Sequence, residues 1–565
     1  MEATPYNAAR MRPAVLRVIL GVVVVSTLLS PWRRELYVGD ETKYAEVVRE
    51  MRSGSLVVPM LGGQPFTHKP PLHFWAMALL SFPLGLYSIW PFVLPSLIAF
   101  VALILVMKRM GDELFGPQAG GWAAFVTASS LMIWGSAQTA RMDVEFTLLV
   151  TAGVWMLHRF LKGGESRDLF VAAAFIAVAT LDKGPMAPVI AVALILIERL
   201  QGRRAPRGPY LAALGIIAGT LLLWLIPALI AGGENFMREV VMKQTVGRAV
   251  GSWVHRSPPW FYLVRAPLTL FPWFLLLVIA LFRRVAGSRL PVASEEKTEA
   301  SPDAQLHQQP ATSNRQPDGR AAARFCVSWL FAVVVPYSLI SSKLDIYMMA
   351  AIPPAALLIG WLLSEAPDSR VASWVWRANA SMLLILAAIG AAGLILTPKL
   401  LRGLGADEPL VPAQLVRILF AILIGSSVGW LVVCSVRVRD RTMLSTLAVG
   451  ITVVIALGYA AAVMIGPANE IASTNALIRV LQQQHVEPEA MALYSCPWLW
   501  RRDFPRELER VRYVGPDIRS GSAQWPALVA TSRAHVGEIA EPLRGYRKVA
   551  ELRMIGKWFD VYCRR

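Results

Sequence analysis

The run SIWPFVLPSLIAFVALILVM at residues 88–107, followed at once by Lys108 and Arg109, decides the class of fold. A helix of this length extends about 30 Å, which matches the hydrocarbon thickness of a bilayer. Similar runs recur along the 565 residues, of which 17% are charged, and the mean hydropathy is +0.49. The sequence therefore predicts a polytopic all-α membrane protein. It excludes a soluble enzyme, a fibrous protein, a disulfide scaffold and a transmembrane β-barrel.

Thirteen apolar segments are interpreted as membrane spans. They lie at 13–31, 88–107, 119–138, 143–161, 167–182, 184–199, 209–231, 259–282, 324–340, 345–364, 374–397, 412–436 and 442–466. A further apolar stretch, 70–87, begins with Pro70 and Pro71 and is interpreted as a re-entrant or interfacial helix.

The net charge of +18 has two candidate sources in a membrane protein: basic cytoplasmic loops and an anionic substrate outside. With the N-terminus inside and 70–87 not crossing, the basic clusters between spans, including Lys108 and Arg109, all fall on the inner side. The positive-inside rule therefore predicts an inner-membrane protein with a cytoplasmic N-terminus and a C-terminus outside the cytoplasm. No nucleic-acid partner is needed to explain the charge.

Two domains are predicted: a transmembrane catalytic domain at 1–466 and a small α/β domain outside the membrane at 467–565. The first outer loop, 32–87, is long and contains a short amphipathic helix at 41–52 that we expect to lie at the membrane interface. The segment 285–322 is rich in Ser, Pro, Gln, Glu and Ala and is predicted to be a disordered cytoplasmic loop.

The C-terminal domain alternates one helical pattern, STNALIRVLQQQ (473–484), with short strand-like runs. The runs are AMALYSC (490–496), ERVRYVG (509–515), ALVATS (527–532), KVAELRM (548–554) and WFDVYC (558–563). Cys496 and Cys563 both lie in this domain and could pair in an oxidising compartment.

Acidic and basic residues gather in the outer loops, against the charge bias, which indicates a cavity for an anionic lipid substrate. Asp40 follows the first span and begins the helix at 41–52. It either caps that helix, with Glu41 complementing the helix dipole, or acts as a general base toward an acceptor hydroxyl. Both roles could hold together, because a capping carboxylate is well fixed in space.

Three lysines, Lys69, Lys183 and Lys343, lie at the outer ends of apolar segments. Each alone could reach toward lipid headgroups. Together they indicate a phosphate site, to which Arg248 could add a bidentate contact. An enzyme that cleaves a sugar–phosphate bond needs such cations, because negative charge builds on the leaving phosphate.

Asp143 precedes the span at 143–161, where it either caps the helix or acts as a second acid that positions the acceptor or a divalent cation. His255 in an outer loop is either solvated or oriented toward substrate or metal. If a divalent cation binds, Asp40, Asp143 and His255 are its candidate ligands. The sequence contains no Gly-rich nucleotide loop, and no cofactor is required.

Four ordered stretches resemble the GT-C glycosyltransferases of the aminoarabinose transferase type, relatives of the protein O-mannosyltransferases. They are GDETKYAEVVREMRSGSLVVPMLGGQPFTHKPPLHFW (39–75), LDKGP (181–185), VGRAVGSWVHRSPPWFYL with the later FPW (246–273), and YSLISSKLDIYMMAAIPPAALLIG (337–360). The resemblance implies a GT-C fold and sugar transfer from a polyprenyl-phosphate donor, such as an undecaprenyl phosphate sugar, to an acceptor outside the cytoplasm.

Carried over by position, the resemblance implies a catalytic role for Asp40, with Glu41 beside it, and makes Asp143 the second acid. It implies donor-phosphate or substrate contacts for a larger set: Lys43, Tyr44, Lys69, Lys183, Arg248, His255, Lys343 and Tyr347. Attack from the face opposite the phosphate predicts inversion at the anomeric carbon.

The sequence departs from the family pattern at several places. Lys43 replaces an Arg, His68 replaces a frequent Glu, Val93 replaces a frequent Arg, and Gln244-Thr245 replaces Glu-Asn. These departures leave the sugar and the acceptor open among lipid A, another glycolipid, a cell-wall glycan and an exported protein.

Two other classes compete with the transferase. A flippase or transporter for a lipid-phosphate sugar would also need the phosphate cluster, although charged groups within the spans are few and no long repeat is apparent. Alternatively, the C-terminal domain could be a binding module and the spans only its membrane anchor. The polar residues in the loops between the spans argue against this class.

Overall fold

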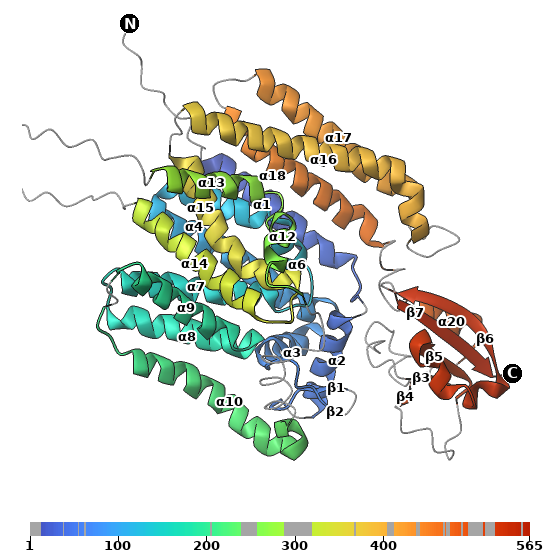
Figure 1. Ribbon diagram of the computed structural model, residues 1–565. Coiled ribbons are helices and arrows are strands. Elements are labelled where there is room, and N and C mark those ends of the chain that lie inside the picture. The colour runs from blue at the N-terminus through green and yellow to red at the C-terminus, as the bar shows by residue number, and fades with distance from the viewer. Residues whose placement is uncertain are drawn as a thin grey trace, which may run out of the picture.

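The structure is a bundle of helices with a small sheet beyond one end (Figure 1). The computed structural model describes residues 13–37, 39–54, 56–61, 64–86, 88–203, 206–238, 257–287, 319–365, 369–403, 412–436, 441–466, 469, 475–486, 490–494, 512–514, 526–554 and 557–564. The predicted fold class, an all-α membrane bundle with a small α/β domain, is confirmed.

The bundle helices follow the apolar runs of the sequence. They are α1 (Pro13–Leu29), α4 (Trp90–Phe115), α5 (Pro117–Ala128), α6 (Leu131–Ala137), α7 (Asp143–Leu161), α8 (Ser166–Lys183), α9 (Met186–Leu200), α10 (Tyr210–Arg238), α12 (Phe261–Thr269), α13 (Phe274–Gly287), α14 (Gly319–Leu339), η4 (Asp345–Ala351), α15 (Ile352–Ser364), α16 (Ser369–Gly403), α17 (Ala413–Val436), α18 (Arg441–Tyr459) and η5 (Ala460–Met464).

The count of thirteen spans is not confirmed. Within the described residues, eight helices are long and apolar enough to cross a bilayer, and α12 with α13, bent by 113°, makes a ninth. Several predicted spans are shorter or broken: the segment at 119–138 divides into α5 and α6, and α9 has 15 residues. An apolar run sets the length of a hydrophobic segment, but packing against neighbours decides where the helix breaks.

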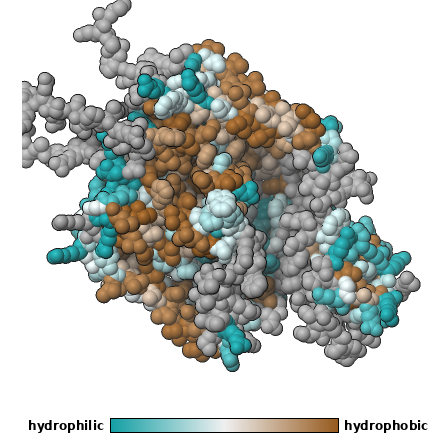
Figure 2. All heavy atoms as spheres, in the orientation of Figure 1, coloured by the Kyte–Doolittle hydropathy of each residue, from teal (hydrophilic) through white to brown (hydrophobic). Residues whose placement is uncertain are grey.

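The bundle packs around large aromatic side chains and exposes an apolar outer surface. Trp273, Trp329 and Phe125 are fully buried in its core. Leu223 on α10 and Ile395 on α16 are exposed, and Figure 2 shows hydrophobic side chains over much of the bundle while hydrophilic ones gather on the C-terminal domain. Exposed apolar area of this extent fits contact with lipid rather than water.

The segment between α1 and α4, predicted as the first outer loop, forms a small unit of its own. It contains α2 (Asp40–Ser53), β1 (Met60–Leu61), β2 (Gln64–Pro65) and α3 (Leu72–Leu84). The predicted helix at 41–52 is present, but its apolar face packs against α3 rather than facing a bilayer, since Val47 and Val48 are completely buried. Helix α3 is about 20 Å long, shorter than a hydrocarbon core, in agreement with a segment that does not cross.

The C-terminal region is a five-stranded mixed sheet in the order β4-β3-β5-β7-β6. All five predicted strand runs contain a strand, and the predicted helix is α20 (Asn475–Gln483), which packs on one face of the sheet through Leu477. The strands are β3 (Met491–Tyr494), β4 (Arg512–Val514), β5 (Leu528–Ser532), β6 (Tyr546–Met554) and β7 (Lys557–Arg564). The predicted pairing of Cys496 with Cys563 involves Cys496, which lies outside the described residues.

Two hydrogen bonds fasten the chain after the last span to the segment between α1 and α2. The side chain of Asn469 accepts from the backbone N–H of Glu35 at 3.1 Å and donates to the carbonyl of Arg33 at 2.8 Å. The C-terminal domain therefore begins at the end of the bundle where α2 begins. The predicted loop at 285–322 is shorter than expected, because α13 reaches Gly287 and α14 starts at Gly319; residues 288–318 lie outside the described part.

Candidate active site

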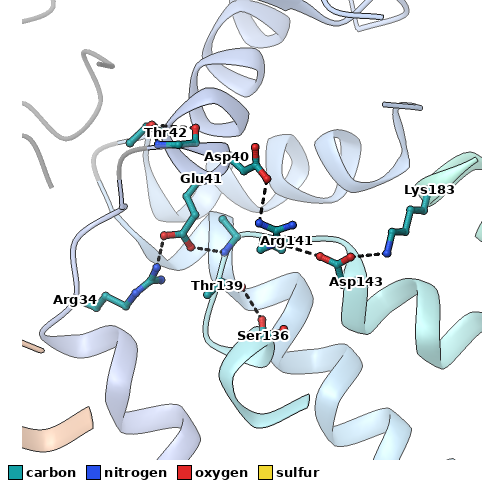
Figure 3. A network of polar contacts seen from close by, with 11 residues as sticks. Arg34, Asp40, Glu41, Thr42, Ser136, Thr139, Arg141, Asp143 and Lys183 are labelled. Carbon is teal, nitrogen blue, oxygen red and sulfur yellow. Dashed lines mark hydrogen bonds and ion pairs between the residues drawn. The ribbon is translucent and has the colours of Figure 1, made fainter. Parts of the chain in front are cut away.

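Asp40 is the first residue of α2, not its cap. Gly39 is the N-cap, with a φ of 133° that L side chains rarely adopt. The hydroxyl of Thr42 accepts from the Gly39 N–H at 3.2 Å and so satisfies the start of the helix. The Asp40 carboxylate is therefore not used in capping and turns toward Arg141 (Figure 3).

An ion-pair network joins four residues from three parts of the chain (Figure 3). Arg141 donates from Nη1 to Asp40 Oδ2 at 2.9 Å and from Nε to Asp143 Oδ2 at 3.0 Å. Lys183, the last residue of α8, donates to the other oxygen of Asp143. The network brings together the predicted residues Asp40, Asp143 and Lys183.

Exposure differs sharply along this network. The side chains of Asp143 and Lys183 are 3% and 8% exposed, whereas Asp40 is 42% exposed. Although burial opposes its charged form, Asp143 and Asp40 raise the pKa of Arg141, so the guanidinium remains charged. The buried end of the network, Asp143 with Lys183, is thus a fixed charge pair. Asp40 is the exposed end, which a substrate can reach.

The predicted alternative that Asp143 caps its helix is not what the structure shows. Met142 is the N-cap of α7, and Asp143 is the first helical residue. Its two oxygens are taken by Arg141 and Lys183. Lys183 directly precedes Gly184, whose φ of 102° ends α8 and lets the lysine stay at the helix terminus.

Aromatic rings extend the network toward the loop after α14. The Lys183 ammonium lies 5.2 Å from the ring centroid of Tyr347 and 5.2 Å from that of Phe146. Tyr347 in turn stacks on Tyr337, with ring centroids 5.5 Å apart. The structure thereby places the predicted residue Tyr347 next to Lys183.

Lys343 is buried, and its known contacts are with neutral groups. Its ammonium donates to the carbonyl of Ser257 at 3.0 Å and to the carbonyl of Ile340. Burial lowers the pKa of this ammonium. Lys69 precedes α3, is half-buried, and interacts electrostatically with Asp143. Lys69 therefore lies beside the network, and Lys343 precedes Tyr347, the neighbour of Lys183, by four residues.

Glu41 points away from this network (Figure 3). It forms a buried ion pair with Arg34 and accepts from the backbone N–H groups of Tyr37 at 2.9 Å and Ala140 at 2.7 Å. These contacts fasten the loop that carries Arg141. Glu41 is therefore a scaffold for the candidate site and not part of its reachable surface.

The remaining predicted site residues divide into two groups. Tyr44 is buried behind Asp40, and burial raises the pKa of its hydroxyl. Lys43 is half-buried on α2 and does not join the ion-pair network formed by the described residues. Arg248 and His255 lie outside the described residues.

The two acids predicted as cation ligands are engaged otherwise. Asp40 and Asp143 share the guanidinium of Arg141, and the third candidate, His255, lies outside the described residues. A different group, His73 with Glu145 and Asp182, brings ligand atoms close enough to hold a metal ion.

Arg141 is the member of the ion-pair network that sequence reasoning missed. Its position in Arg141-Met142-Asp143 was visible, yet nothing in that tripeptide indicates that the guanidinium reaches Asp40, which lies 101 residues earlier. An unpaired basic residue in an outer loop, against the charge bias, was the available signal.

The helical bundle carries a charged cluster and a small sheet at one end, and known proteins share this fold and part of this sequence. The sequence profile of the family described as dolichyl-phosphate-mannose-protein mannosyltransferase matches residues 68–224. The crystal structure of ArnT from Cupriavidus metallidurans bound to undecaprenyl phosphate has the same fold, with a TM-score of 0.68 over 97% of this chain and 98% of that one, at 18% identity.

Two proteins of similar sequence match a larger part of the chain than the family profile does. The undecaprenyl phosphate-alpha-4-amino-4-deoxy-L-arabinose arabinosyl transferase of Pectobacterium atrosepticum is 23% identical over 466 residues, covering 79% of this chain and 75% of that protein. A second arabinosyl transferase of the same description, from Pseudomonas fluorescens, is 26% identical over 443 residues, 76% of this chain and 68% of that protein. The predicted resemblance to the aminoarabinose transferase type is confirmed.

Proposed function

We propose that this chain is a membrane glycosyltransferase that moves a sugar from undecaprenyl phosphate to an acceptor outside the cytoplasm. The observation that carries the proposal is the network Asp40–Arg141–Asp143–Lys183, which is buried at one end and reachable at Asp40. The relatives named above are arabinosyl transferases that use an undecaprenyl phosphate sugar, and the shared fold supports the same class of donor.

The donor phosphate binds among the lysines of the outer loops. Lys343 supports this role because the two groups that its ammonium contacts are carbonyls, which do not neutralise its charge. Lys69 lies at the same end of the bundle. Arg248, outside the described residues, is kept from the sequence as the candidate for a bidentate contact. These cations stabilise the negative charge that grows on the leaving phosphate.

Asp40 acts on the acceptor. The acceptor oxygen attacks the anomeric carbon while the bond from that carbon to the phosphate oxygen breaks, and the electron pair leaves with the polyprenyl phosphate. The acceptor proton passes to the Asp40 carboxylate, and the sugar inverts at the anomeric carbon. Arg141 holds the carboxylate in place through a single hydrogen bond to Oδ2. Asp143, the second acid, acts through Arg141 and Lys183.

The acceptor is lipid A or another envelope glycolipid, glycan or protein. A phosphate acceptor is already ionised and has little use for a base, whereas a hydroxyl acceptor needs one. The dependence of transfer on Asp40 therefore separates these two acceptor chemistries.

We place the chain in the inner membrane with its N-terminus in the cytoplasm and its active site and C-terminal domain in the periplasm. Helix α7 supports this orientation, because it begins at Asp143 in the site and ends about 28 Å away beside Arg159 and Lys162. Basic residues are retained on the cytoplasmic side.

Mass spectrometry of envelope glycolipids tests the proposal. Cells that express the wild-type chain, Asp40→Asn or no chain are compared, with Asp168→Asn as the matched control at the opposite end of α8. A sugar-sized addition with wild type and Asp168→Asn, but not with Asp40→Asn at equal membrane levels, supports the transferase and names sugar and acceptor. Full transfer by Asp40→Asn overturns the base assignment. Donor translocation without any covalent product, in lipids, glycans or proteins, favours a flippase.

A further inference from the structure

Three helix ends meet beneath the candidate active site and bring together His73, Glu145 and Asp182. His73 is in the first turn of α3, Glu145 is in the first turn of α7, and Asp182 is in the last turn of α8. One ligand atom from each lies within 4.8 Å of the others. His73 Nδ1 is 3.0 Å from Glu145 Oε2 and 3.1 Å from Oε1.

The cluster is largely buried, and several of its polar atoms have no partner among the described residues. His73 and Asp182 are fully buried, and the Glu145 side chain is 13% exposed. Neither oxygen of Asp182 has a hydrogen-bond partner among the described residues, and neither has His73 Nε2. The rings of Tyr44 and Phe74 pack against the imidazole, with centroids 6.0 and 6.2 Å away. Two buried carboxylates with unsatisfied atoms are costly unless a cation or a proton compensates their charge.

Among the described residues, no lysine or arginine makes an ion pair with Glu145 or Asp182, and His73 can offset the charge of only one of the two carboxylates. The nearest lysine in sequence, Lys183, donates to Asp143 instead. The C-terminus of α8 carries the negative end of the helix dipole, which adds to the cost of burying the Asp182 carboxylate there. The other two helix ends, those of α3 and α7, are N-termini. The positive end of each helix dipole stabilises only a carboxylate within its own first turn.

We propose that His73, Glu145 and Asp182 bind a zinc ion that joins α3, α7 and α8. One imidazole nitrogen and two carboxylate oxygens make a ligand set that zinc accepts, and three protein ligands leave a fourth position for water. Zinc with two carboxylates and a neutral imidazole is uncharged overall. Magnesium fits less well, because it retains several waters and prefers oxygen ligands.

This metal would position the catalytic network without touching the substrate. Glu145 follows Asp143 by two residues on α7, Asp182 directly precedes Lys183, and His73 follows Lys69 by four residues. A single ion would therefore fix the relative positions of three residues that the proposed function uses. The metal site itself is independent of which reaction the chain catalyses.

A proton shared by Glu145 and Asp182 is the competing account, because the two carboxyl groups lie within hydrogen-bonding reach of each other. The two accounts differ in how they respond to substitution. The amide of Asp182→Asn can donate to Glu145 in place of a shared proton but removes a zinc ligand, so the variant mimics the proton-sharing contact and destroys the metal site.

The test measures zinc in the purified full-length chain in detergent. Wild type, Asp182→Asn, His73→Gln and the matched control Asp168→Asn are stripped with a chelator and dialysed against micromolar zinc. Bound metal is then counted by plasma mass spectrometry. We expect about one zinc per chain in wild type and Asp168→Asn, and at least a tenfold weaker affinity in the two cluster variants.

Two further readouts do not depend on transfer activity. Zinc should raise the Tm of stripped wild type and of Asp168→Asn, and leave that of Asp182→Asn unchanged. X-ray absorption at the zinc edge should show one imidazole in wild type and none in His73→Gln. Equal zinc content in wild type and Asp182→Asn, or no zinc in either with Tm unaffected by chelator, overturns the proposal in favour of the shared proton.

Discussion

The guanidinium of Arg141 donates to the carboxylate of Asp40 over 2.9 Å, although the two residues are 101 positions apart in the chain. The same guanidinium donates through Nε to Asp143 at 3.0 Å. One side chain therefore couples the exposed acid to the buried one. The loop that carries it is fixed in turn, since Glu41 accepts from Ala140 N and Ser96 donates to the Arg141 carbonyl at 2.7 Å.

Replacing Arg141 with lysine should lower the turnover of sugar transfer by about a hundredfold while leaving the KM for donor nearly unchanged. A lysine keeps the charge but cannot contact two carboxylates through a planar fork. Steady-state kinetics with the purified chain would measure the turnover and the KM for donor separately. Arg109→Lys, at an exposed position on α4, should behave as wild type. A pure rise in KM would instead make Arg141 a donor contact.

Replacing Glu41 with glutamine should destabilise the chain more than it impairs chemistry. It breaks the buried ion pair with Arg34, and losing one partner of such a pair costs about 3 kcal/mol of unfolding free energy. Thermal unfolding in detergent would measure this loss, with Glu165→Gln at an exposed position as control. A normal Tm combined with abolished transfer would show that Glu41 is catalytic.

Replacing Lys343 with methionine should raise the KM for the undecaprenyl phosphate donor by about ten- to a hundredfold, because a charge-assisted contact to phosphate is lost. The same change should alter the Tm only slightly, because the removal of a buried charge opposes the loss of its two hydrogen bonds to carbonyls. Donor titrations and thermal unfolding test both expectations, with Lys162→Met as control. A fall in Tm with an unchanged donor KM would assign Lys343 to structure alone.

Glu46 on α2 should make stability depend on pH. The carboxylate is 1% exposed, and burial raises its pKa from 4.5 to about 7 despite the ion pair with Arg49. Because the folded pKa lies above the unfolded one, the native state binds more protons, and stability falls as pH rises from about 4.5 to 7.

Glu46→Gln should remove this dependence and raise the Tm above pH 7 but not below pH 5. The raised pKa of Glu46 corresponds to a change of about 3 kcal/mol at most in the free energy of unfolding. Thermal unfolding across this pH range is the measurement. A variant that loses stability equally at all pH values would show that the contact with Arg49 outweighs the burial of the charge.

Much of this architecture could be predicted from the chain alone. Apolar runs gave the helical bundle, and the strand runs after residue 490 each contain a strand of the C-terminal sheet. The structure brings the predicted residues Asp40, Asp143, Lys183 and Tyr347 together, and their roles stay predictions. The number of spans could not be predicted, since α5 and α6 are separated by a break that depends on packing.

The sequence by itself determined the membrane class, the polar outer end and the motifs that resemble glycosyltransferases, because hydrophobicity and short-range spacing are local properties. Only the tertiary structure decided that Arg141 bridges Asp40 and Asp143, that Glu41 supports a loop, and that His73 meets Glu145 and Asp182. Those relationships depend on which helix ends adjoin one another. That arrangement follows from how the buried side chains pack in the bundle core. The core draws residues from helices far apart in the chain, so no local stretch of sequence determines it.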